Sequence, residues 1–471
     1  METAKTEIVV IGGGPGGYAA AFYAADLGKK VVMVEMERLG GVCLNRGCIP
    51  SKALLHATKM IAEARESASR GITFGAPTID LEKLRSWKGA ILDKLTGGIG
   101  ALAKARGVEV IHGKAYLDDS HTLRVETATG QRYLQFEHAI VAVGSIPALP
   151  KAFDLGNPRI MTSTEALEMP DIPERLLVVG GGYIGMELGT VYSWIGSEVH
   201  LVEAAETVLA GSDPDLARPV LTAAQKKFKS LRFKAKVLSM STAGKQIKVA
   251  IEHDGRTTEE LFDRVLVSVG RRPIEVDFGL ENTKAQRDAK GFIKVNESLQ
   301  TDDPAIYAIG DIVGGAMLAH KAAKEARLAI NAIVGDGAPT RDFVVPAVVF
   351  TEPELAWCGL TEGEAKAKGI AVEVAKFPWG ASGRALTFDH PDGLTKLLIE
   401  PGTEKILGVG LVGHGAGELI GEGVVAVEMG ATVSDLADCV HPHPTLSETL
   451  MEAAELYFGH STHAYQRRRA H

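Results

Sequence analysis

The sequence predicts an α/β protein with two Rossmann-like dinucleotide-binding domains and a C-terminal α+β domain. Two observations carry this prediction: a glycine-rich strand–turn–helix fingerprint near the N-terminus, and a second copy of it later in the chain. A third is the change to alternating apolar segments from about residue 342 onward, which is typical of an antiparallel sheet. The length of 471 residues fits this arrangement, because a single core stops growing at roughly 250–300 residues.

The first fingerprint follows the apolar run at residues 8–11 and has the form G-x-G-x-x-G at Gly12, Gly14 and Gly17. An alanine-rich helical stretch and a second strand follow, and that strand ends on Glu35. In this context Gly12 permits a tight turn, Gly14 lets the backbone approach a pyrophosphate, and Gly17 lets the helix pack closely. The helix N-terminus offers free N–H groups to the phosphates, and Glu35 would accept hydrogen bonds from ribose hydroxyls.

The second fingerprint has its glycines at Gly180, Gly182 and Gly185 and its acidic strand end at Glu203. The two copies align without a gap, because 168 positions separate Gly12 from Gly180 and Glu35 from Glu203. A single glycine turn without a ligand is the alternative, and two copies in register disfavour it. Two sites imply two dinucleotides. At the second, the Glu203 carboxylate would repel a 2′-phosphate, which favours NAD over NADP.

The rest of the chain is predicted from its apolar patterns. Residues 52–104 are expected to be mainly helical, and short strands should end at residues 140–145. Further strands are expected at 265–270, 306–309, 347–350 and 397–399, and helices at 417–429 and 447–457. We expect the first dinucleotide-binding domain at 1–150 and 274–341, the second at 151–273, and the C-terminal domain at 342–471.

Composition and charge exclude several classes of function. The chain has 51 Lys and Arg against 59 Asp and Glu, a net charge of −8, which argues against a nucleic-acid-binding surface. We find no apolar run of membrane-spanning length and no signal-peptide pattern at the start. Four cysteines are too few for a secreted disulfide framework. We therefore expect a cytoplasmic protein that binds neither nucleic acid nor membrane.

Cys43 and Cys48 form a C-x4-C pair just after the first acidic strand end. On a straight helix their Cα atoms would lie roughly 8–9 Å apart, too far for a disulfide, so the segment must be kinked. Gly47 and Pro50 make a break plausible, and a following helix N-terminus with Arg46 nearby would stabilise a thiolate. The pair indicates a redox-active disulfide. Two unpaired structural thiols are the alternative, and the lack of further nearby ligands predicts no metal site.

Two further features concern the remaining cysteines and a polar C-terminal segment. Cys358 and Cys439 stand alone in the sequence and are expected to be ordinary buried cysteines. His443 and Glu448 lie in a proline-rich segment in which Ser447 or Thr445 could cap the helix that carries Glu448. A dithiol substrate needs a base, because the thiolate is the nucleophile, and a histidine held by a carboxylate suits that task. A surface loop is the alternative.

These motifs resemble those of the flavoprotein disulfide reductases over about residues 6–457. The most specific segment is 40–55, which contains both cysteines, Ser51 and Lys52. Members of that family that reduce glutathione or trypanothione typically carry a second lysine where Ser51 stands. The chain is therefore most similar to the members that oxidise dihydrolipoamide. The other matching segments are 180–187, 270–273, 310–311, 317–320 and 443–445 with Glu448.

The resemblance implies FAD at the first fingerprint and NAD at the second, and it assigns roles to residues. Cys43 would exchange with the substrate, and Cys48 would lie next to the flavin. Lys52 and Glu187 match a pair beside the reactive edge of the flavin, and His443 matches the base with Glu448 as its partner. The implied FAD-binding residues are Gly12, Gly14, Gly17, Glu35, Lys52, Gly144, Asp311, Met317, Leu318, Ala319 and His320. The implied NAD-binding residues are Gly180, Gly182, Gly185, Glu203 and Gly270.

The implied activity is NAD-dependent oxidation of dihydrolipoamide, free or carried on a lipoyl-bearing protein of a 2-oxo acid dehydrogenase or related system. His443 would act in the neighbouring subunit's site, so the resemblance implies a homodimer with the C-terminal domain as its interface. The main alternative is an NAD(P)H-dependent reductase of another disulfide such as glutathione, against which Glu203 and Ser51 count. A flavoprotein scaffold without turnover is a second alternative, disfavoured by the intact cysteine pair.

Overall fold

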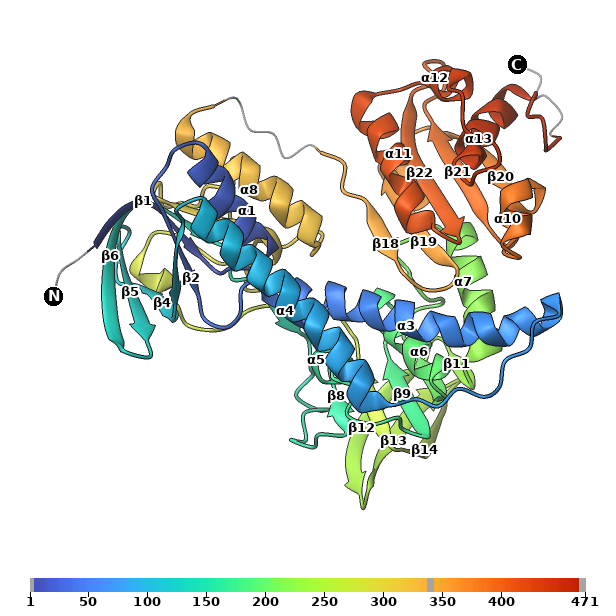
Figure 1. Ribbon diagram of the computed structural model, residues 1–471, viewed down its shortest axis with the longest axis horizontal. Coiled ribbons are helices and arrows are strands. Elements are labelled where there is room, and N and C mark those ends of the chain that lie inside the picture. The colour runs from blue at the N-terminus through green and yellow to red at the C-terminus, as the bar shows by residue number, and fades with distance from the viewer. Residues whose placement is uncertain (1–3, 337–342, 466–471) are drawn as a thin grey trace.

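The computed structural model describes residues 4–336 and 343–465. The structure has three units: a first sheet with its helices, a second sheet that is lower in the view, and a C-terminal unit at the upper right (Figure 1). No helix among the described residues is both long and apolar enough to cross a lipid bilayer.

The first unit is built on a seven-stranded sheet in the order β3-β2-β1-β6-β5-β4, with β17 also paired to β6. These strands are β1 (Ala4–Ile11), β2 (Val31–Glu35), β3 (Glu109–His112), β4 (Lys114–Leu117), β5 (Thr122–Thr127), β6 (Gly130–Val141) and β17 (Ile306–Ala308). Strands β3, β2, β1, β6 and β17 pair in parallel, whereas β4 and β5 extend the sheet in antiparallel fashion. Because β17 joins the sheet late in the chain, this unit is made from two separate segments.

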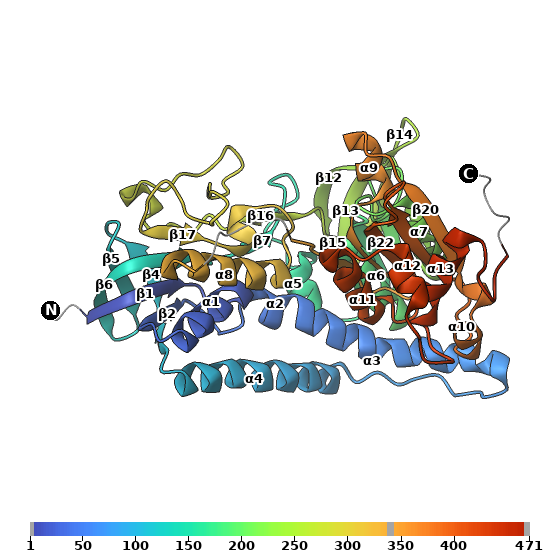
Figure 2. The same cartoon turned by 90° about the horizontal axis from the view of Figure 1, so that it is seen from above.

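Helices of the first unit place the N-terminal fingerprint and the cysteines. They are α1 (Pro15–Asp26), α2 (Gly41–Arg46), α3 (Cys48–Glu66), α4 (Leu81–Ala105) and α8 (Ala319–Val334), with the 3-10 turns η1 (Ser67–Arg70), η2 (Leu280–Asn282) and η3 (Gly310–Val313). Helix α1 packs against α8. Helix α3 runs from the first unit to the C-terminal unit, and α4 returns along it (Figure 2).

The second unit repeats the parallel arrangement. Its five strands have the order β11-β10-β9-β15-β8, all parallel. They are β8 (Ile160–Met161), β9 (Arg175–Val179), β10 (Glu198–Val202), β11 (Ser230–Arg232) and β15 (Arg264–Val267), with helices α5 (Ser163–Leu167), α6 (Tyr183–Trp194) and α7 (Pro214–Lys227). The second unit also contains a separate antiparallel sheet of three strands: β12 (Lys236–Ala243), β13 (Gln246–His253) and β14 (Arg256–Phe262). Where the chain enters and leaves this unit, β7 (Ser145–Pro147) pairs antiparallel with β16 (Arg271–Pro273).

The C-terminal unit is an antiparallel sheet in the order β18-β19-β22-β21-β20. Its strands are β18 (Ala347–Val349), β19 (Glu354–Gly359), β20 (Glu373–Pro378), β21 (Leu394–Ile399) and β22 (Ile406–Gly413). Its helices are α9 (Glu362–Lys368), α10 (Gly383–Thr387), α11 (Ala416–Met429), α12 (Val433–Asp438) and α13 (Glu448–Phe458), with the turn η4 (Trp379–Ala381). The predicted fold class, two dinucleotide-binding units and a C-terminal α+β domain, is confirmed. The domain boundaries stay a prediction, and the last of them, between 341 and 342, lies outside the described residues.

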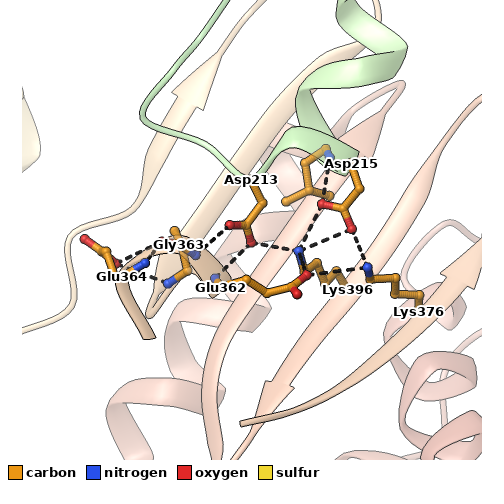
Figure 3. A network of polar contacts seen from close by, with 9 residues as sticks. Asp213, Asp215, Glu362, Gly363, Glu364, Lys376 and Lys396 are labelled. Carbon is orange, nitrogen blue, oxygen red and sulfur yellow. Dashed lines mark hydrogen bonds and ion pairs between the residues drawn. The ribbon is translucent and has the colours of Figure 1, made fainter. Parts of the chain in front are cut away.

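A buried ion cluster joins the second unit to the C-terminal unit (Figure 3). The ammonium of Lys396, on β21, has no exposed side-chain surface and lies 2.7 Å from Asp213 and 2.9 Å from Asp215. It also pairs with Glu362 at the start of α9. Lys376 adds a second cation 2.6 Å from Asp215. The start of α7 is therefore fixed to the C-terminal sheet by charge as well as by apolar packing.

Candidate active site

One cavity collects most of the residues expected at the FAD site. It is lined by the turn before α1, by both cysteines, by the strand ends of the first sheet and by residues at the start of the second fingerprint helix. Among the expected residues, its lining includes Gly14, Glu35, Cys43, Cys48, Lys52, Gly144, Glu187, Asp311, Met317 and Ala319. Four expected residues, Gly12, Gly17, Leu318 and His320, do not line it. The His320 ring nitrogen Nε2 lies 2.7 Å from the carbonyl oxygen of Pro346 instead.

The two fingerprint turns have the same geometry. Gly12 and Gly180 have φ angles of +103° and +104°, which favour glycine. A Cβ at Gly17 would lie 1.8 Å from the carbonyl oxygen of Gly12, and one at Gly185 would lie 2.0 Å from that of Gly180. A Cβ at Gly182, in contrast, would meet nothing within 4 Å. The glycine backbone thus closes the turn on one side and leaves open space at the helix N-terminus, where a phosphate can approach.

The acidic residues at the two strand ends are held identically. In the first copy, Glu35 accepts hydrogen bonds from the N–H groups of Gly13 at 2.6 Å and Glu37 at 2.8 Å. In the second, Glu203 accepts them from Gly181 at 2.5 Å and Ala205 at 2.6 Å. Each carboxylate is therefore fixed beside its fingerprint as a negative charge.

The charges around Glu203 bear on the choice between NAD and NADP. The nearest arginine on the adjoining strand, Arg232, is paired with Glu260 at 2.6 Å and is not free to bind a phosphate. A 2′-phosphate near Glu203 would therefore meet a carboxylate without a free guanidinium to balance it.

The helix break expected at the cysteine pair is confirmed. Helix α2 ends at Arg46, α3 begins at Cys48, and Gly47 between them has φ −148° and ψ −109°. Both cysteines are free thiols in this structure and hydrogen bond to each other. Cys48 is the first residue of α3, where the positive end of the helix dipole favours a thiolate.

Electrostatics distinguish the two thiols. The hydrogen bond from Cys43 and the charge of Lys52 lower the pKa of Cys48 to about 7, against the opposing effect of burial. The hydrogen bond with Cys48 and burial raise the pKa of Cys43. The expectation that Arg46 supplies the positive charge was wrong, because its guanidinium pairs with Glu37. Lys52, one turn into α3, supplies it instead.

Lys52 and Glu187 form an ion pair across the cavity. The Lys52 ammonium lies 3.0 and 2.8 Å from the two carboxylate oxygens of Glu187, whose side chain is buried. No sequence motif pointed to a third member, Phe350, from the C-terminal unit. Its N–H donates to Glu187 at 3.0 Å, and its ring centroid lies 4.3 Å from the Lys52 ammonium. It is 163 positions from Glu187, beyond the reach of any local motif.

A second polar group lines the cavity beside the β7–β16 pair. Asp311 accepts a hydrogen bond from the Ser145 hydroxyl at 2.5 Å. Arg271, on β16, donates to the same hydroxyl at 2.8 Å and lies 3.9 Å from Asp311. Gly144 and Gly270, next to these strands, both have positive φ angles, +76° and +129°. This places Asp311 with its charge partly balanced, facing the space expected to hold FAD.

His443 and Glu448 come together as expected. The His443 Nδ1 atom lies 2.8 Å from a Glu448 oxygen, and the other oxygen accepts the Thr445 N–H at 2.7 Å. The expected capping was wrong, since Ser447 stands at the N-cap of α13 but its side chain makes no capping bond. The His443 side chain is 70% exposed and does not line the cavity of its own subunit. In this chain, His443 is therefore separate from the cavity that holds the cysteine pair.

The other expected features have mixed outcomes. Cys358 is buried as expected, but Cys439 is exposed, so half of that prediction was wrong.

Glu352, His390 and His414 bring three ligand atoms within 4.8 Å of one another, an arrangement that could hold a metal. The Lys59 ammonium, however, pairs with Glu352 and lies 3.2 Å from His414 Nδ1. Because that ammonium already occupies the place of a cation, we assign no metal there.

Two family models match the chain. The model for pyridine nucleotide-disulphide oxidoreductases covers residues 6–326, and the model for the dimerisation domain of the same family covers 345–454. The chain belongs to the pyridine nucleotide-disulphide oxidoreductase family. Membership implies FAD and NAD as cofactors. The cavity at the first fingerprint fits FAD, and the open space at Gly182 in the second fits the pyrophosphate of NAD. The dimerisation-domain match supports a homodimer.

Members of this family are similar along almost the whole chain. The dihydrolipoyl dehydrogenase of Haemophilus influenzae is 44% identical over 460 residues, 97% of this chain and 96% of the relative. That of Staphylococcus aureus is 42% identical over 459 residues, 98% of each chain. Among solved structures, LpdA from Mycobacterium tuberculosis has a TM-score of 0.88 at 30% identity, covering 96% of this chain and 99% of its own. A Cu(II) complex of the flavoprotein disulfide reductase RclA from Escherichia coli has a TM-score of 0.86 at 27% identity, covering 97% and 100%.

Proposed function

We propose that this protein is a dihydrolipoyl dehydrogenase, which oxidises dihydrolipoamide to lipoamide and reduces NAD⁺ to NADH. The observation that carries the proposal is the asymmetric thiol pair at the α2–α3 break. Cys43 and Cys48 lie in the same cavity as the first fingerprint, and only Cys48 has a pKa lowered to about 7. An exchanging thiol and a thiolate beside the cofactor are the two roles that such an enzyme needs.

The chain's own residues divide the reaction as follows. In the oxidised enzyme Cys43 and Cys48 form a disulfide. One thiol of dihydrolipoamide attacks Cys43 while the partner subunit's His443 takes its proton, and the Cys43–Cys48 bond breaks to release the Cys48 thiolate. The second substrate thiol then attacks the substrate sulfur bound to Cys43, closes the lipoamide disulfide and gives its proton to the released Cys43, which leaves two electrons on the cysteine pair. Glu448 holds the His443 ring by its Nδ1 atom. When bound, FAD supplies the path for the electron pair from Cys48 to NAD⁺.

Several finer assignments belong to the same proposal. Glu203 binds the adenosine ribose of NAD and rejects the 2′-phosphate of NADP, supported by its fixed carboxylate. Lys52 and Glu187 would lie beside the reactive edge of a bound flavin, and Asp311 would hold its ribityl chain. The physiological substrate is a lipoyl group on a carrier protein of a 2-oxo acid dehydrogenase or related system. The expected cytoplasmic location stays a prediction.

An anaerobic titration of the purified holoenzyme with dihydrolipoamide tests the proposal. We expect a long-wavelength charge-transfer band to appear in the visible spectrum and then to disappear, with formation of NADH, when NAD⁺ is added. A flavin that stays oxidised with dihydrolipoamide but is reduced by NADPH would contradict the proposal. That result would favour a glutathione-type disulfide reductase.

A further inference from the structure

The turn formed by residues 350–353 joins β18 to β19 and lies against α3. Two lysines of α3, Lys52 and Lys59, are seven positions apart and therefore lie on one face of the helix. The turn contacts both of them: the Phe350 ring lies over Lys52, and the Glu352 carboxylate pairs with Lys59. The C-terminal unit thus holds α3 at two points, two turns apart.

Phe350 contacts both members of the ion pair that lines the cavity. Its ring centroid is 4.3 Å from the Lys52 ammonium, within the range of a cation–π interaction. Its backbone N–H, 3.0 Å from a Glu187 oxygen, fixes the carboxylate that receives the same ammonium. The ammonium is therefore held from two sides, by a carboxylate of the second unit and by a ring of the C-terminal unit.

The position of the Lys52 ammonium matters because of Cys48. The two residues are four positions apart at the start of α3, so their side chains lie on the same face of the helix. After the hydrogen bond with Cys43, the charge of Lys52 is the main influence that lowers the pKa of Cys48. A Lys52 ammonium that moves towards solvent would stabilise the thiolate less.

We propose that Phe350 is a positioning residue that holds the Lys52 ammonium in place between Glu187 and Cys48. Through it, the C-terminal unit sets the charge around the thiol that faces the cofactor. Phe350 is only half-buried, and it packs at the margin of the apolar core instead of filling its centre. The inference rests on the proposed function in one respect only, namely that a flavin binds next to Cys48.

The test uses the Cys43→Ser holoenzyme, in which Cys48 is the only thiol of the pair. The pH dependence of its long-wavelength charge-transfer band reports ionisation of Cys48. Adding Phe350→Leu should raise the midpoint of this titration by about 0.5 pH unit or more, because the cation–π contact is lost. Phe350→Tyr, which keeps the ring, should restore the midpoint to that of the parent enzyme.

A matched control removes a contact of the same kind elsewhere. Tyr116→Leu deletes the ring that lies 4.6 Å from the Arg124 guanidinium, on strands that do not line the cavity. It should leave the midpoint unchanged. If Phe350→Leu lowers the melting temperature but leaves the midpoint unchanged, Phe350 acts through packing alone and the proposal is overturned.

A second measurement gives the pKa of Cys48 if the charge-transfer band cannot be observed. The pH dependence of iodoacetamide alkylation at Cys48, followed by peptide mass spectrometry, gives the thiol pKa without the flavin spectrum. A Cys43→Ser holoenzyme with no band at any pH would count against the proposed function. Comparing alkylation of that enzyme with and without Phe350→Leu would still decide the role of Phe350. If Phe350→Leu does not fold, Phe350→Met keeps similar volume without the ring and should show the same upward shift.

Discussion

Replacing Lys396 by methionine removes the central cation of the cluster that joins the second unit to the C-terminal unit. The Lys396 side chain is fully buried and pairs with Asp213, Asp215 and Glu362. Removing one partner of a buried ion pair typically costs about 3–5 kcal/mol, because it leaves uncompensated buried charge. The Asp215 and Glu362 side chains are 30% and 41% exposed, so water screens part of the remaining charge. We therefore expect a loss of about 3 kcal/mol in the free energy of unfolding.

The matched control is Lys376→Met, in the same cluster. The Lys376 side chain is 41% exposed and pairs with Asp215 and Glu362. Because exposed ion pairs contribute little, this change should cost less than about 1 kcal/mol. Urea unfolding of both holoenzyme variants, followed by tryptophan fluorescence, measures the difference. Equal effects of the two substitutions, or a Lys396→Met loss below about 1 kcal/mol, would show that burial of Lys396 does not decide the strength of the cluster.

The difference in the free energy of unfolding between the parent enzyme and Lys396→Met should depend on pH. Burial raises the pKa of Asp215, but hydrogen bonds and charge from Lys376 and Lys396 outweigh it and lower the pKa below its ordinary value. A carboxyl with a lowered pKa in the folded state stabilises the protein above its unfolded pKa of about 3.9 and loses this contribution as the pH falls. The difference between parent and Lys396→Met should therefore be full at pH 7 and shrink below about pH 4.

Three further predictions concern the catalytic and binding sites. Gly185→Ala places a Cβ 2.0 Å from the Gly180 carbonyl oxygen, so NAD affinity should fall at least about tenfold while bound FAD is unchanged; equal loss of both would contradict separate sites. Glu448→Gln should lower kcat by about 10–100-fold at unchanged KM for NAD, because the protonated His443 loses its carboxylate; unchanged kcat would refute this role. The charge-transfer band of the reduced enzyme should fade as the pH falls through about 7, where Cys48 takes up its proton, and a band that appears only at about pH 9 or above would refute the lowered pKa.

Local sequence patterns predicted what local geometry determines. The spacing of the two fingerprints predicted both parallel units in register, because Gly12 and Gly180 adopt positive φ angles and a Cβ at Gly17 or Gly185 would collide with the carbonyl oxygen of its own turn. The distance limit on a disulfide predicted a break between the cysteines, and the structure places it at Gly47. Alternation of apolar residues predicted the antiparallel C-terminal sheet.

Residues whose roles depend on distant partners could not be predicted in this way. Arg46 stands between the two cysteines in sequence, but its charge goes to Glu37, and only the fold shows that competition. Phe350 and Lys396 make their decisive contacts 163 and 183 positions away. Cys439 lies exposed just after α12, whereas Cys358 is buried within β19.

The β7–β16 pair has a consequence for how this architecture can change. The chain leaves the first unit at β7 and returns at β16, and these two short strands lie hydrogen-bonded side by side. The two ends of the second unit therefore lie next to each other. Domains with adjacent termini tolerate insertion into, or exchange within, another protein. A nucleotide-binding unit of different specificity could be exchanged at this ribbon without cutting the first sheet, provided that it keeps Arg271 for Ser145 and a partner for Lys396.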